Sequence, residues 1–294
     1  MSSHVTVASR RDTSGAGIMM MILAMALVPM IDVQAKHLVV GGVPAMQVIF
    51  LRMTCGTILL LPVMLAGRRG EIIPPDGRIN AVLLGLFSIT AGFCFFGALE
   101  YLSIADTVAI SFVQPLFVTM LSRLFLKETV GPARWIALFV GFGATLVIIR
   151  PSHGALQPGS LLALASGAAM AGYVILVKKS TVGSRRVSPL TLTFQTHFMA
   201  VLVGAPLMAL IWVGLSPEQG WMGLGMTLFG LVGQYLIIKA YNCADASLVA
   251  PLSYLEIVTS TAASWLFFSQ VPDRITFVGV AILICSSVFI AWRR

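Results

Sequence analysis

Ten stretches of about twenty mostly apolar residues follow one another along the chain, and this series limits what the chain can fold into. A helix needs about 20 such residues to cross the hydrocarbon core of a bilayer. Short segments rich in Gly, Pro, Ser and Asp join the stretches. We therefore expect an all-α integral membrane protein with ten transmembrane helices. The stretches are 16–36, 45–66, 80–100, 105–126, 133–150, 159–178, 190–214, 220–240, 246–268 and 275–292.

The composition agrees with a chain that lies mostly in lipid. Of the 294 residues, 58% are hydrophobic and 10% are charged, whereas a soluble domain carries about 25% charged residues. The net charge of +8 comes from basic residues scattered through short loops. We therefore expect a lipid bilayer as the environment and no nucleic acid as a partner. The four cysteines lie within apolar stretches at spacings that do not suit a metal, so we expect neither a metal site nor a cofactor.

Lysine and arginine are unevenly distributed over the predicted loops. If the N-terminus is cytoplasmic, most of these residues fall on cytoplasmic loops and helix ends. The opposite side then carries Lys36, Arg150 and Arg274. Cytoplasmic loops of membrane proteins carry an excess of Lys and Arg. The sequence therefore predicts that both termini lie in the cytoplasm.

The second half of the chain repeats the first. A shift of 142 residues lays Gly17 on Gly159 and Ser122 on Ser264, and similar matches continue in order. We therefore expect two repeats, 16–150 and 159–292, with five spans each. Because five is odd, the two repeats must cross the membrane in opposite senses. Inverted repeats are common in secondary transporters, whose substrate site lies near the bilayer midplane between the repeats.

Charged residues inside the apolar stretches indicate where this chain works. A charge at the centre of a spanning helix costs about 2.5–3.5 kcal/mol even on lenient scales, so it usually faces a partner or a water-filled cavity. Asp32, Lys36, Arg52 and Glu100 all fall in the extracytoplasmic third of their predicted spans. Either they neutralise one another as a structural ion network, or they form an outer gate or a substrate site. Lys36 lies near the interface and could also simply extend its amine to water.

Polar residues near the midplane extend this candidate site. Gln114 and Glu256 are equivalent under the shift of 142 residues, and Glu256 could line a cavity or carry a coupling proton. Tyr235 and Tyr254 could stack on a flat ring whose edge Gln234 would bind, although tyrosines in a helical bundle are often simply packed.

His197 is the repeat partner of Arg52 at a slightly larger offset, and the orientation above places it on the cytoplasmic side. It could be a hydrogen-bonded interior group or a proton relay. Pro29, Pro115 and Pro251 are predicted to kink their helices, because proline removes a backbone hydrogen bond.

The chain also resembles a known family. The stretch 105–150, Lys36 at the end of the first span, and Pro44 followed by Phe50, Leu51 and Arg52 are similar to a repeat of the EamA family of drug/metabolite transporters. The resemblance covers about residues 16–292. It implies a ten-helix secondary transporter with a central cavity, lined mainly by helices 1, 3, 4, 6, 8 and 9. Members of this family move amino acids, vitamins, nucleosides or related metabolites.

Two departures from the family pattern lie in the second repeat. Ser269–Gln270 stands where the first repeat has Lys127–Glu128, and Ile257 stands where the first repeat has Pro115. Asp32, Lys36 and Arg52 together look most like the uptake carriers for riboflavin or S-adenosylmethionine. The resemblance thus implies uptake of a vitamin-like aromatic solute such as riboflavin across the bacterial inner membrane. S-adenosylmethionine uptake, or export of an amino acid or another metabolite, is the alternative.

Other classes of function have less support. No Asp-Asp-x-x-Asp, His-Glu-x-x-His, Gly-x-Ser-x-Gly or Gly-Lys phosphate-loop motif occurs, so we expect no enzyme and no ATP-driven pump. A channel is the remaining alternative, and an inverted repeat favours alternating access over an open pore. The oligomeric state stays open, with a homodimer as one alternative.

Overall fold

A computed structural model describes residues 5–66, 77–126, 157–181, 187–243, 252 and 255–292, and positions 136, 139, 140, 143, 144 and 147. These residues form helices and contain no strand, as the hydropathy predicts. The helices are α1 (Val5–Val40), α2 (Ala45–Ala66), α3 (Arg78–Ala98), α4 (Ile104–Ser111), α5 (Gln114–Leu126), α7 (Pro158–Thr181), α8 (Pro189–Ile211), α9 (Pro217–Cys243), α11 (Leu255–Phe268) and α12 (Arg274–Trp292).

The expectation of ten spans is confirmed in part. Within the described residues, seven helical segments are long and apolar enough to cross a membrane. The stretch 246–268 is described as helix only from Leu255 onward, and most of 133–150 lies outside the described residues. Prediction and structure agree on the bounds 45–66, whereas α1 begins well before its apolar part. The seven segments are Gly15–Val40, Ala45–Ala66, Arg78–Ala98, Ile104–Phe125, Pro158–Val177, Leu190–Ile211 and Pro217–Ala240.

The fourth span is interrupted near its middle. Helix α4 ends at Ser111, and α5 begins at Gln114, directly before Pro115. Proline has no backbone N–H to donate and fits the first turn of a helix, so it favours a new helix start over a continuous helix. Glu256, the repeat equivalent of Gln114, also lies in the first turn of its helix, α11. By contrast, Pro29 lies inside the unbroken α1, and Pro251 lies outside the described residues.

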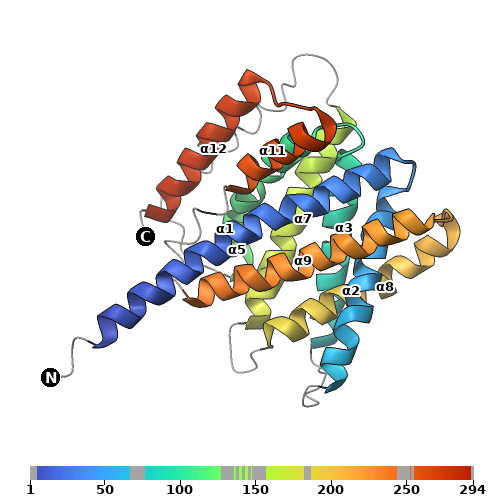
Figure 1. Ribbon diagram of the computed structural model, residues 1–294, viewed down its shortest axis with the longest axis horizontal. Helices are drawn as coiled ribbons and strands as arrows, with labels where there is room; N and C mark the ends of the chain where they lie inside the picture. The colour runs from blue at the N-terminus through green and yellow to red at the C-terminus, as the bar shows by residue number, and fades with distance from the viewer. Residues whose placement is uncertain are drawn as a thin grey trace.

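Helices from the two halves of the chain pack against one another in matching pairs. Helix α1 packs along α9, which lies beside it in Figure 1, and α3 packs along α7. Under the shift of 142 residues, α1 corresponds to α7 and α3 corresponds to α9. The α1–α9 pair of one repeat arrangement is therefore equivalent to the α7–α3 pair of the other. The pairs α2–α9 and α3–α8 are equivalent in the same way. The α2–α8 pair is formed by equivalent helices and maps onto itself.

Apolar side chains occupy both the interior and the outside of this bundle. Ile49, Leu84 and Met226 are fully buried, whereas Leu124, Leu210 and Trp221 are largely exposed. Exposed side chains of this kind on membrane-spanning helices fit the hydrocarbon of a bilayer. The exterior is therefore suited to lipid.

A pair of hydrogen bonds at Gln47 and a close packing contact at Gly85 hold α2, α3 and α8 together. The fully buried Gln47 side chain donates to the Val213 carbonyl oxygen (2.6 Å) and accepts from the Val213 backbone N–H (2.9 Å). These two hydrogen bonds join the start of α2 to the segment after α8. At Gly85, a Cβ atom would lie 2.6 Å from the backbone nitrogen of Ala200. The missing side chain therefore lets α3 approach the backbone of α8 closely.

The Gly85 contact gives a stability prediction. Gly85→Ala should lower the melting temperature of the detergent-purified protein, because the new methyl group meets α8 backbone that cannot move aside cheaply. The matched control is Gly220→Ala, because a Cβ there meets nothing within 4 Å. Equal melting temperatures for the two variants would contradict this packing.

Candidate functional site

Helix α1 carries two charged side chains one turn apart. Asp32 is 5% exposed and Lys36 is 4% exposed, although both carry charge at neutral pH in water. Helix α1 packs against α9 and α11, so both side chains lie where the two halves of the chain meet. Asp32 and Lys36 contact different residues, so the predicted ion network consists of two separate layers, one around each side chain.

Lys36 forms the first layer. Its Nζ donates to the Leu102 carbonyl oxygen and to Gln270 Oε1, both at 2.7 Å. The amine also lies 5.2 Å from the centre of the Phe268 ring, at a distance that allows a cation–π contact. Leu102 belongs to the first repeat and Gln270 to the second. We call this arrangement, formed by Lys36, Leu102 and Gln270, the Lys36 bridge.

The structure does not place Glu100 with Lys36. Helix α3 ends at Ala98, so Glu100 lies in the following turn, where it is exposed. Asp106 instead lies close enough to Lys36 for their charges to interact. Its Oδ2 accepts a hydrogen bond from Ser103 (2.7 Å), whose hydroxyl caps the start of α4. Sequence reasoning missed Asp106 because it lies at a helix start rather than inside an apolar run.

Asp32 belongs to the second layer. Its charge interacts with those of Glu256 on α11 and Arg52 on α2. No described residue donates a hydrogen bond to Asp32 Oδ2, although that atom is buried. An unpaired buried oxygen of this kind is costly and calls for an explanation.

Arg52 lies against α9. Its Nη2 is 3.0 Å from the position that a Cβ at Gly230 would take, so the glycine leaves space for the guanidinium group. The Thr227 hydroxyl donates to the backbone carbonyl oxygen of Arg52 (3.2 Å) and fixes α2 against α9. The Arg52 charge also interacts with Tyr173 on α7.

His197 completes the second layer. It is 6% exposed, its ring lies over Gly56 of α2, and its Nδ1 donates to the Thr193 carbonyl oxygen at 2.8 Å. Gln234 on α9 donates to Thr193 Oγ1 at 3.1 Å, so α8 and α9 are linked here. We call Asp32, Arg52, Tyr173, His197 and Glu256 the Asp32 cluster.

Arg52 and His197 are closer than the sequence predicted. We expected them on opposite sides of the membrane, but the His197 ring lies against Gly56, one turn after Arg52 on α2, and the two charges interact. Both lie roughly two turns into their helices, and α2 packs against α8. Equivalent positions near the axis that relates two repeats come close together, which explains the difference.

Other predicted site residues lie apart from the cluster. Tyr235 is 59% exposed, and its ring contacts Lys239 one turn further along α9. Its ring therefore lies on a different side of α9 from Gln234, because neighbouring positions on a helix face different directions. Gln114 is partly buried at the start of α5, and no described contact joins it to the cluster. Tyr254 lies outside the described residues.

Tyr173 was missed by sequence reasoning. It is partly buried on α7, hydrogen-bonds with the Thr196 side chain and interacts with Arg52. A signal existed, because the shift of 142 residues lays Tyr173 on Ile31, directly beside Asp32. The residue is neither charged nor unusual in a membrane helix, so it did not attract attention.

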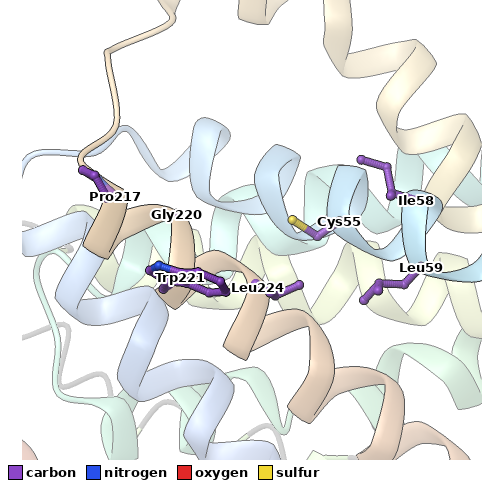
Figure 2. A pocket seen from close by; sticks show the side chains of 7 residues that line it. All are labelled: Cys55, Ile58, Leu59, Pro217, Gly220, Trp221 and Leu224. Carbon is purple, nitrogen blue, oxygen red and sulfur yellow. The ribbon is translucent and has the colours of Figure 1, made fainter.

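An apolar groove on the side of the bundle is separate from this cluster. Figure 2 shows it between α2, with Cys55, Ile58 and Leu59, and the first turns of α9. Ile58 and Trp221 are largely exposed, and the lining is almost entirely apolar. The groove therefore suits lipid hydrocarbon and offers no groups that would bind a polar solute.

A bundle of apolar helices with buried charges between its halves defines a multi-pass membrane protein of the transporter type. The profile of the EamA-like transporter family matches residues 15–150 and again 157–292. The chain belongs to the EamA-like transporter family. This result supports a small-molecule transporter in a membrane rather than an enzyme.

Named relatives move different solutes. The pseudopaline exporter CntI of Pseudomonas aeruginosa is 25% identical over 94% of this chain and 96% of its own length. A riboflavin transporter of Rhizobium johnstonii is 31% identical over 72% of this chain and 68% of its own. An S-adenosylmethionine uptake transporter of Rickettsia bellii is 28% identical over 90% of this chain and 89% of its own. A crystal structure with 17% identity aligns with a TM-score of 0.61 over 95% of this chain and 99% of that one, which supports the fold.

The charges of the Asp32 cluster give a second stability prediction. The cluster holds two carboxyl groups and one guanidinium group, so Asp32→Asn leaves a balanced pair of Arg52 and Glu256. Asp32→Asn should therefore raise the melting temperature of the solute-free protein. Arg52→Gln should lower it, because two acids then lack a cation. A lower melting temperature for Asp32→Asn would show that Asp32 is needed for stability instead.

Proposed function

We propose that this protein is a secondary carrier that moves a small organic metabolite across a bacterial inner membrane and binds it at the Asp32 cluster. The observation that carries the proposal is the burial of Asp32 with an unpaired oxygen, on a helix that packs against both α2, which carries Arg52, and α11, which carries Glu256. Charges inside spanning helices are expensive and usually serve function. Gln234, through its hydrogen bond to Thr193, supports the His197 side of the site.

The proposal includes two inverted five-helix repeats, 16–150 and 159–292, that exchange conformations. Two features support it. The family profile matches twice, and helix pairs that are equivalent under the repeat pack against each other in the same way. The distribution of Lys and Arg supports cytoplasmic termini, which puts the Lys36 bridge on the outer side. The solute would reach the cluster from either side in turn.

The Lys36 bridge is proposed as the latch of the outer gate. It joins the turn after α3 to the turn after α11, and so it ties the two repeats together at one end of the bundle. A buried amine with two short hydrogen bonds holds that end closed, and opening requires both bonds to break. Glu100 is exposed and is not part of this gate.

Relatives named as riboflavin and S-adenosylmethionine transporters support uptake of one of these solute types, which the resemblance also implied. The exporter among the relatives supports the reverse direction. Saturable counterflow in proteoliposomes separates a carrier from a channel, because only a carrier exchanges bound solute across the membrane. The solutes to test are riboflavin, S-adenosylmethionine, nucleosides and amino acids.

The cluster assignment predicts transport defects. Asp32→Asn, Arg52→Gln and Glu256→Gln should each reduce counterflow of the transported solute at least tenfold, since each removes about 1.4 kcal/mol or more of solute binding. The control is Glu100→Gln, which changes an exposed carboxylate and should leave counterflow unchanged. Wild-type counterflow in all three cluster variants would refute this site.

The latch makes a separate prediction about accessibility. Cys94 is buried one turn before the end of α3, the helix that leads into the turn that Lys36 holds. In a protein whose other cysteines are replaced by alanine, Lys36→Met should speed labelling of Cys94 by a membrane-impermeant maleimide added outside. Lys36→Met leaves the Leu102 and Gln270 acceptors unpaired, so the closed state is destabilised. An unchanged labelling rate would argue that Lys36 is not a latch.

A further inference from the structure

We infer that the Asp32 cluster recognises the amino-carboxylate headgroup of a zwitterionic solute, with its ammonium group at Asp32 and Glu256 and its carboxylate at Arg52. This inference rests on the proposed function, because it names the class of solute bound at the same site. It favours amino acids and solutes that carry an amino-acid headgroup over a flavin.

The first argument is the balance of charge. Asp32 and Glu256 supply two carboxyl groups, whereas Arg52 is the single arginine or lysine of the cluster. Burial makes an uncompensated negative charge expensive, so Arg52 alone balances one ionised carboxylate and not two. A solute that brings an ammonium group lets both carboxyl groups ionise, and a solute without a positive charge does not.

The second argument is the unpaired acceptor. Asp32 is nine-tenths buried or more, and its Oδ2 receives no hydrogen bond from any described residue. An ionised carboxylate only accepts hydrogen bonds, so the missing partner must be a donor. Among donors, an ammonium group carries three N–H bonds and a compensating charge, and it suits a site between two carboxyl groups.

The third argument concerns the carboxylate. Arg52 presents a planar guanidinium group whose paired N–H bonds match a carboxylate. Gly230 leaves space for this group against α9, and Thr227 fixes the backbone of Arg52. A solute carboxylate could accept a hydrogen bond from this guanidinium group and balance its charge.

The fourth argument is the proximity of Asp32 to Arg52. The charges of Asp32 and Arg52 interact, so the two side chains lie on the same side of the site. An amino acid carries its ammonium and carboxylate groups on one carbon atom. One such headgroup can therefore contact both side chains at once.

The same residues offer little to a flavin ring. Tyr235, which could have stacked on a flat ring, lies on the exposed face of α9. Tyr173 and His197 carry the rings of the Asp32 cluster, but the Tyr173 hydroxyl hydrogen-bonds with Thr196 and the His197 ring lies against Gly56 of α2. A neutral ring system would bring no cation to balance the second carboxyl group.

The test compares solutes that lack one charge with variants that lack the matching residue. The detergent-purified full-length protein is screened by thermal shift against the protein L-amino acids, S-adenosylmethionine and riboflavin, and hits are confirmed by counterflow. For the best amino-carboxylate, affinity is then measured for the parent solute, its carboxamide and its N-acetyl derivative. Each is tested on wild type, Asp32→Asn, Arg52→Gln and the control Glu100→Gln.

We expect the carboxamide and the N-acetyl derivative to bind wild type about tenfold to hundredfold more weakly than the parent solute, as expected for loss of a charged hydrogen bond. The carboxamide penalty should disappear in Arg52→Gln, and the N-acetyl penalty should disappear in Asp32→Asn. Both penalties should persist in Glu100→Gln. If Arg52→Gln does not fold, Arg52→Lys keeps the charge without the planar fork and should show a smaller carboxamide penalty.

The outcomes separate this inference from the proposed function. Counterflow of riboflavin without binding of any amino-carboxylate overturns the inference and leaves the carrier intact. Penalties that stay the same in the matching variants also overturn it, because the headgroup then binds elsewhere. Counterflow of none of the solutes, nucleosides included, contradicts the carrier itself.

Discussion

The cost of holding charge inside a bilayer is the constraint on which this structure depends. Most of the chain is apolar, and its exterior suits lipid, so the few charges inside its spans must meet between helices. Asp32 on α1, Arg52 on α2 and Glu256 on α11 do so, with Tyr173 and His197 beside them. The glycines at 56 and 230 allow His197 and Arg52 to pack against neighbouring backbone. The bundle is thus arranged around a polar centre that a purely structural core would not need.

The two polar layers have different roles in this account. The Asp32 cluster is incomplete in hydrogen bonds and charge, as expected of a site that is completed by a solute. The Lys36 bridge is complete, because its amine has two short hydrogen bonds and lies over an aromatic ring. The complete Lys36 bridge between the two repeats stabilises one closed state. Binding of a solute to the incomplete Asp32 cluster supplies free energy that can shift the protein to another state. One turn of α1 separates the two layers, so movement of α1 would couple them.

The sequence predicted the spans better than the directions of their side chains. Hydropathy alone located the seven described segments, since their length is set by the bilayer. Asp32, Arg52 and Glu256 could be identified from the sequence, because charged residues are rare in membrane-spanning helices. The direction of Tyr235 could not be read from the sequence, since a helix that is apolar on all sides has no polar face to fix its rotation. Glu100 lies beyond the end of α3, which hydropathy does not locate to the residue. Asp106 and Gln270 lie at helix ends, where turn geometry rather than hydropathy decides the contacts.

The most direct test of the central claim is protection of the buried carboxyl groups by solute. A hydrophobic carbodiimide reacts with carboxyl groups inside the membrane, and mass spectrometry of the modified peptides identifies the labelled residues. The account predicts that Asp32 and Glu256 are labelled in the empty protein, and that a saturating concentration of the solute that shows counterflow protects both. Labelling of Asp32 and Glu256 that is unchanged by this solute would contradict the claim that the Asp32 cluster binds it.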